Sequence, residues 1–122
     1  MKRRNWTEEE QRIICRAYLF LLAEQAAGRT ANKAALCRRI LPTLDDRSRG
    51  SYELKMMNVS AALQTVRPNW PNVKGYKAAG HAQKSLAAIL ADEINRAFPN
   101  VYQHRYAAYP LDRAVYGPNA GN

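Results

Sequence analysis

The chain has 122 residues, which is enough for one hydrophobic core and too few for two independent ones. A composition of 47% hydrophobic and 24% charged residues is typical of a folded domain and excludes an intrinsically disordered chain. Nineteen Lys and Arg against ten Asp and Glu give a formal net charge of +9. That excess favours a polyanionic partner, nucleic acid before a membrane surface.

Several protein classes find no support in the sequence. The apolar runs are far shorter than the roughly 20 residues that cross a bilayer, and acidic residues follow the basic N-terminus where a secretory signal would be apolar. We therefore expect a cytoplasmic protein, associated with the nucleoid when bound to DNA. Cys15 and Cys37 lack metal-ligand spacing, so we expect two reduced, buried thiols, with a disulfide as the alternative. Without a phosphate-binding loop or nucleophile motif, we expect no enzyme, no cofactor and no metal.

The first helix is predicted over residues 7–27. Thr7 and Glu10 have the spacing of a capping box, and apolar residues then recur at helical intervals until Gly28. A second helix is predicted over residues 31–41, because Pro42 cannot continue it.

The third helix is expected to begin at Ser51, with the serine oxygen as its N-cap, and to end at Arg67. It carries two apolar stripes, which predicts a helix wedged between neighbours. After a connector over residues 68–80, a fourth helix is predicted over 81–98.

These elements predict an all-α fold: a compact bundle of about four helices with a helix-turn-helix-like arrangement. The bundle would take residues 1–98. An irregular, basic tail over residues 99–122, rich in tyrosine, would pack on it or extend it.

The strongest candidate site lies where the charged loop 42–50 leads into the third helix. Two arginines beside a helix N-terminus and a capping serine would receive phosphate oxygens well. The predicted DNA contacts of this segment are Arg47, Arg49, Ser51, Tyr52, Lys55 and Asn58. The alternative is that Arg49, Glu53, Lys55 and Asn58 pair with one another in a buried structural network.

The segment also resembles a known family. Its pattern is Arg47-Ser48-Arg49-Gly50-Ser51-x-Glu53-x-Lys55-x-x-Asn58-x-Ser60-Ala61-x-Leu63, followed by Gly75-Tyr76-Lys77 and Gln83-x-x-Leu86. With Trp6-Thr7-x-Glu9-Glu10, Tyr18 and Asn32-Lys33-Ala34, it resembles the N-terminal helical domain of HNH-type restriction endonucleases, including those directed at modified DNA. A weaker similarity is to Myb-like helix-turn-helix domains. The resemblance implies a DNA-engaging head in restriction, phage or mobile-element biology, without cleavage, because no HNH constellation is present.

A second candidate site surrounds Gly75, where Lys74, Tyr76 and Lys77 are predicted to contact DNA. Glycine suits a positive φ there, after which Tyr76 could stack on a base and Lys77 could reach a phosphate. The alternative is that Tyr76 covers the core. The tail offers a third candidate, with bases stacking on Tyr102, Tyr106, Tyr109 and Tyr116 or these rings simply packing on the bundle. Neither His81 nor His104 is expected to be a ligand or a base.

The sequence thus favours a non-catalytic module that binds duplex DNA. The alternative is a protein-interaction or oligomerisation adaptor, or an inhibitor, docked on a nuclease or defence complex. A surface patch with Met56 and Met57 would support the adaptor. A homodimer is a further candidate, and a stable dimer indifferent to DNA would favour the adaptor. A small nuclease would need carboxylates that converge. The candidates are Asp45 and Asp46 with Glu53, and Asp92 with Glu93, and adjacent carboxylates on a loop are expected to face solvent.

Overall fold

A computed structural model describes residues 5–80 and 83–97 of the chain. Its elements are α1 (Glu8–Ala26), α2 (Lys33–Ile40), the 3-10 turn η1 (Leu41–Thr43), α3 (Arg49–Val66) and α4 (Lys84–Ala97). The described residues hold four α-helices and no strand, so the prediction of an all-α bundle is confirmed. The predicted tail, with its four tyrosines and His104, lies outside these residues, as does His81. None of the described helices is both long and apolar enough to span a bilayer.

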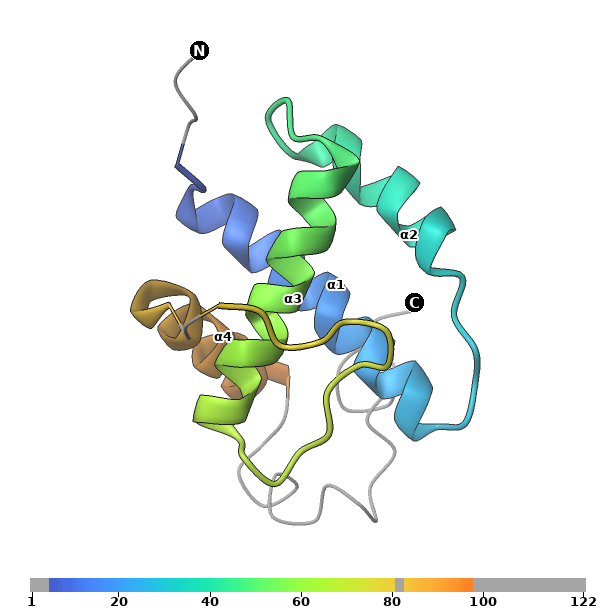
Figure 1. Cartoon of the computed structure of the whole chain (residues 1–122), viewed down its shortest axis with the longest axis vertical. Coiled ribbons are helices and arrows are strands. Elements are labelled where there is room, and N and C mark those ends of the chain that lie inside the picture. Colours follow the sequence, from blue (N-terminus) through green and yellow to red (C-terminus); the bar gives the residue numbers. More distant parts are fainter. Residues whose placement is uncertain (1–4, 81–82, 98–122) are drawn as a thin grey trace.

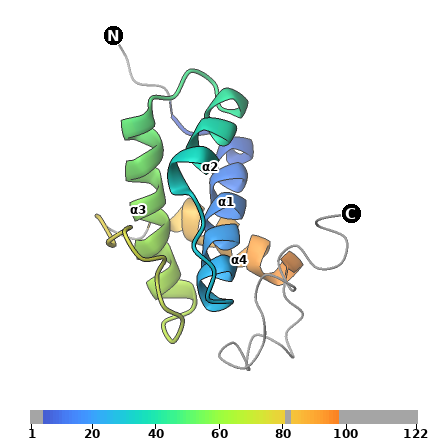
Figure 2. The same cartoon turned by 90° about the vertical axis from the view of Figure 1, so that its right-hand side faces the viewer.

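The centre of the fold is formed by α1, α3 and α4, each packed against the other two, with α2 beside α1. Figure 1 shows α3 crossing α1, and Figure 2 shows α2 and α1 running along one side of α3. Large side chains with almost no exposure fill the space between the helices, among them Tyr18, Leu22, Tyr52, Leu63 and Leu90. Burial of this apolar surface is the main force that holds the helices together.

The start of α1 is capped as its sequence predicts. Thr7 Oγ1 accepts a hydrogen bond from the Glu10 N–H at 3.1 Å, and Glu10 Oε1 accepts from the Thr7 N–H, also at 3.1 Å. Both members of the capping box are therefore present.

The start of α3 differs from its prediction. The helix begins at Arg49, two residues before the expected start, and Ser48 is its N-cap: Ser48 Oγ accepts from the Ser51 N–H at 3.0 Å. Prediction of Ser51 as the cap was wrong because Ser48 and Ser51 both precede apolar helical positions, and only packing decides between them. α3 packs on both α1 and α4, so its wedged position is confirmed. Of its two predicted apolar stripes, the one with Tyr52, Met56, Val59 and Leu63 is buried, whereas in the other Leu54 is exposed and Met57 only half-buried.

The α2–α3 pair has the element order of a helix-turn-helix. Residues 41–48 join the two helices, a longer link than the three or four residues typical of that motif. Because α3 packs on both α1 and α4, few of its side chains face outward.

The connector over residues 68–80 has no regular structure, and buried hydrogen bonds fix it to α1 and α3. Tyr18 Oη lies 2.7 Å from Ser60 Oγ and accepts from the Val73 N–H at 3.0 Å. Ser60 Oγ in turn donates to the Tyr76 carbonyl at 2.7 Å. The Trp70 ring is buried here.

An ion-pair cluster joins α1 to α4. Arg12 reaches Asp92 and Glu93, both at 2.7 Å, and Arg16 reaches Glu93 at 3.0 Å. Hydrogen bonds from Arg96 and Arg12 lower the pKa of Asp92. The carboxylates of α4 are thereby neutralised within the fold.

Candidate nucleic-acid interface

Arg47, the first of the predicted phosphate contacts, is turned into the protein. Its side chain is only 6% exposed, and its guanidinium donates to the two Glu10 carboxylate oxygens at 3.1 and 3.3 Å. It also donates to the Asn5 carbonyl at 2.9 Å and stacks 4.2 Å from the centroid of the Trp6 ring. A phosphate would have to displace a buried carboxylate to reach it.

Glu10 holds this cluster together. Besides closing the capping box, its carboxylate accepts from the Asp45 N–H at 3.0 Å, so it ties the 42–48 loop to the start of α1. We call Trp6, Glu10 and Arg47 the Arg47 cluster. Glu10 and Arg47 lie 37 positions apart in the chain, so sequence spacing gave no signal of the pairing.

The next three predicted contacts have different environments. Arg49, the first residue of α3, is exposed and makes no ion pair with a described residue. Ser51 is half-buried in the first helical turn. Tyr52 is completely buried, and burial raises the pKa of its hydroxyl. Of these three side chains, Arg49 is the one placed to meet a large ligand.

Lys55 and Asn58 line a groove beside the Trp6 ring. Lys55 is 5% exposed, donates to Gln83 Oε1 at 3.0 Å and lies 5.3 Å from the Trp6 centroid, and burial lowers its pKa. Asn58 donates to the Ala79 carbonyl at 2.9 Å. The groove encloses about 460 Å³. This arrangement differs both from the predicted DNA contacts and from the alternative network. Lys55 bonds to Gln83, which precedes α4, and Asn58 bonds to the connector.

The residues of the second predicted site differ in burial. Tyr76 is 3% exposed, which raises its pKa to about 12, so its ring covers the core, as the alternative proposed. Lys74 and Lys77, its neighbours in sequence, are both exposed. Gly75 has the expected positive φ, +94°.

A residue outside the predicted set joins this site. Lys33, at the start of α2, places its ammonium 5.8 Å from the centroid of the Tyr76 ring. The charge of half-buried Glu53 raises the pKa of the Tyr76 hydroxyl, and the charge of Arg49 lowers it. Lys33 contacts the Tyr76 ring, and Lys74 and Lys77 lie on either side of Tyr76 in the chain. We call these three lysines, together with Arg49, the basic face. In the sequence, Lys33 was noted only within the Asn32-Lys33-Ala34 motif of the family resemblance.

In the described ranges no three His, Cys, Asp or Glu side chains are grouped to hold a metal ion. Cys15 and Cys37 are buried and unbonded to each other, as predicted, and burial raises the pKa of both thiols.

The methionines do not form the surface patch that would have supported the adaptor alternative. Met56 is completely buried and Met57 is half-buried in contact with the core. Across residues 5–80 and 83–97, Leu54 is the large hydrophobic side chain that stands exposed, at 47%. A single exposed leucine is ordinary for a soluble surface and does not define an interface.

Comparison with protein-family models, curated proteins and solved structures found no match for this chain. The resemblance to restriction-endonuclease head domains therefore stays a prediction based on the quoted residues.

Proposed function

We propose that this protein is a non-catalytic DNA-binding module that grips the phosphate backbone of duplex DNA through the basic face. The observation that carries the proposal is the distribution of charge. On α1 and α4, Arg12, Arg16 and Arg96 are held in ion pairs with carboxylates, whereas Lys84 of α4 is exposed and makes none with a described residue, but lies outside the basic face. The four cations of the basic face make no ion pair with any described residue.

Unpaired surface cations are suited to this task. Each phosphate that a lysine or arginine neutralises releases condensed counterions, which drives association independently of base sequence. Paired cations would first have to give up a carboxylate. Arg47, Tyr52 and Lys55 are buried, so the proposed contacts exclude them and rest on phosphate recognition more than on base reading.

The test is a titration of a fluorescent duplex, repeated at several salt concentrations. Lys74→Gln and Lys77→Gln should each weaken binding to every sequence and reduce the slope of log K against log salt by about 0.9. Lys84→Gln is the matched control, because Lys84 is exposed on α4, outside the basic face, and the change removes the same charge. Absence of binding at micromolar protein in low salt, or an equal loss in the control, would overturn the proposal.

The finer proposal, that the module targets modified DNA in a restriction or phage setting, rests on the family resemblance alone. It predicts tighter binding to a duplex with modified bases than to the same plain duplex, at one salt concentration. Equal affinities would remove it and leave backbone binding in place. The adaptor alternative has lost its motivating feature with the burial of Met56, and we do not favour it.

A further inference from the structure

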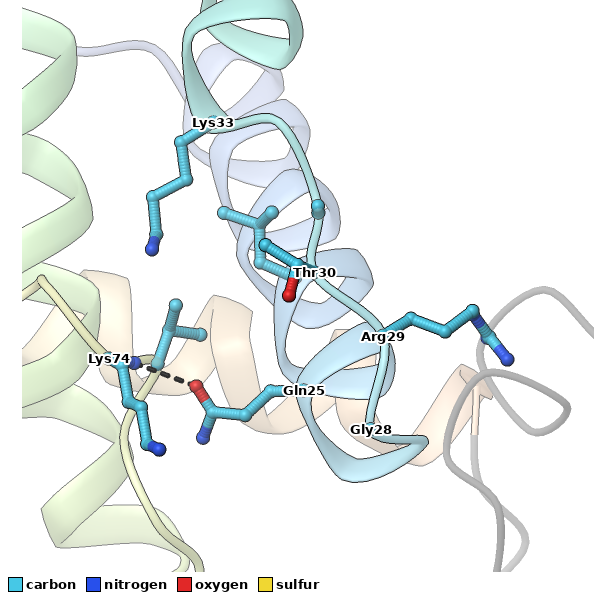
Figure 3. Close-up of a pocket in the computed structure, with 9 residues that line it drawn as sticks. Gln25, Gly28, Arg29, Thr30, Lys33 and Lys74 are labelled. Atoms are coloured by element: carbon cyan, nitrogen blue, oxygen red, sulfur yellow. Dashed lines mark hydrogen bonds between the residues drawn. The ribbon is translucent and has the colours of Figure 1, made fainter.

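A cavity of about 250 Å³ lies next to the basic face, where three segments meet. The end of α1 contributes Leu21 and Gln25, the loop between α1 and α2 contributes residues 28–31, and Lys33, Val73 and Lys74 complete the wall. Figure 3 shows the open space between the start of α2 and the connector. The cavity has an apolar base, since Leu21 and Val73 are buried, and a polar rim.

The rim is cationic. Three basic side chains line it, and no Asp or Glu does. Arg29 is committed elsewhere: it points away from the cavity in Figure 3 and forms an ion pair with Glu24 at 2.7 Å. Lys33 and Lys74 make no ion pair with a described residue, and in Figure 3 they flank the space in front of Gln25. These two lysines therefore supply the charge that a ligand would meet.

Neighbouring groups hold the backbone of Lys74 and the side chain of Lys33 in position. Gln25 accepts from the Lys74 N–H at 2.8 Å and donates to the Asn72 carbonyl at 3.0 Å, which fixes the connector wall. Lys33 runs alongside Gly75, where an added Cβ would come within 3.4 Å of its ammonium nitrogen. The Tyr76 ring then orients the same ammonium by a cation–π contact.

We propose that this cavity binds the phosphoryl group of a phosphate ester, with Lys33 and Lys74 on its oxygens, the Thr30 hydroxyl as a further hydrogen-bond partner, and the attached sugar or other organic group over Leu21 and Val73. The ester is either a backbone phosphate of DNA, in which case the inference rests on the proposed function, or a free phosphorylated molecule. Both sources present the same chemistry to the lysines.

The experiment follows backbone and side-chain amide resonances of the isotope-labelled full chain by NMR. Inorganic phosphate is titrated first, against sodium chloride at matched ionic strength, and a short duplex second. We expect saturable shifts at Thr30, Lys74 and the Gln25 side-chain amide with phosphate and not with chloride. Lys33→Gln and Lys74→Gln should each weaken phosphate binding several-fold, whereas Lys84→Gln should not. Thermal unfolding of each variant shows that it remains folded.

The phosphate and duplex titrations distinguish the cavity proposal from the proposed DNA binding. If phosphate and duplex shift the same resonances and compete, the ligand is a backbone phosphate. If phosphate binds there and the duplex binds nowhere, the cavity accepts a free phosphate ester, and the proposed DNA binding has failed. If the duplex binds while phosphate gives only the shifts seen with chloride, the cavity proposal is overturned and DNA binding stands. A chain that responds to neither ligand overturns both.

Discussion

Replacement of Arg47 by methionine tests whether this arginine stabilises the fold or binds DNA. The change keeps a long side chain that can pack on the Trp6 ring, but it removes the guanidinium from the Glu10 carboxylate. Both side chains of the pair are 6% exposed, so solvent screens their interaction little. We expect a large loss of stability and little change in DNA binding.

The magnitude follows from the partner that is left behind. Removing one member of a buried ion pair costs about 3–5 kcal/mol, because the other charge stays buried without compensation. Glu10 would keep its hydrogen bonds from the Thr7 and Asp45 N–H groups, which places the expected loss at the lower end, about 3 kcal/mol. For a domain of this size, that loss lowers the melting temperature by about 12–24 °C.

The measurements are thermal unfolding and DNA titration below the variant's transition, with Lys84→Gln as the reference for loss of one charge. The double variant with Glu10→Gln should be destabilised by less than the sum of the single changes, because the unpaired carboxylate is gone. Arg47→Met with an unchanged melting temperature and a DNA affinity far below that of Lys84→Gln would refute the reasoning. Arg47 would then be a phosphate ligand in solution.

Three further predictions concern stability alone. Tyr18→Phe should cost about 1–3 kcal/mol in urea unfolding, because the Val73 N–H loses its acceptor in a buried site; an unchanged midpoint would contradict the connector's hydrogen bonds. Ser48→Ala should cost about 1 kcal/mol and Ser51→Ala only a few tenths, whereas the reverse order would restore Ser51 as the cap. Burial raises the Cys15 pKa from 9.0 to about 12, so an unfolded chain releases this proton first and stability should fall as pH rises from 9 toward 12. Urea midpoints across that range should fall less steeply in Cys15→Ala, and equal slopes would show that the thiol is not responsible.

Local patterns were sufficient to predict the four helices. Apolar residues at helical spacing, together with Pro42 and the Thr7–Glu10 capping box, depend on neighbours within one or two turns, and the structure retains them. The start of α3 was misplaced because Ser48 and Ser51, three positions apart, fit the local pattern of an N-cap equally well.

The site was harder to predict, because a cation's role depends on which acid the fold brings to it. Arg47 and Arg49 look alike in sequence, yet Arg47 pairs with Glu10 at the start of α1, and Arg49 meets no described carboxylate. Lys33 and Lys74 are likewise brought together only by packing of α2 beside the connector. The helix faces could be read from spacing, whereas the partner of each charge could not.

The hydrogen bonds of the connector have a consequence for affinity. A loop without regular structure usually loses conformational freedom when it binds, at a cost that subtracts from the interaction. Here Tyr18, Ser60 and Gln25 already hold the backbone on both sides of Lys74. Most of that ordering cost is met during folding, so the backbone that carries Lys74 is preorganised, and a ligand has mainly the lysine side chain left to immobilise.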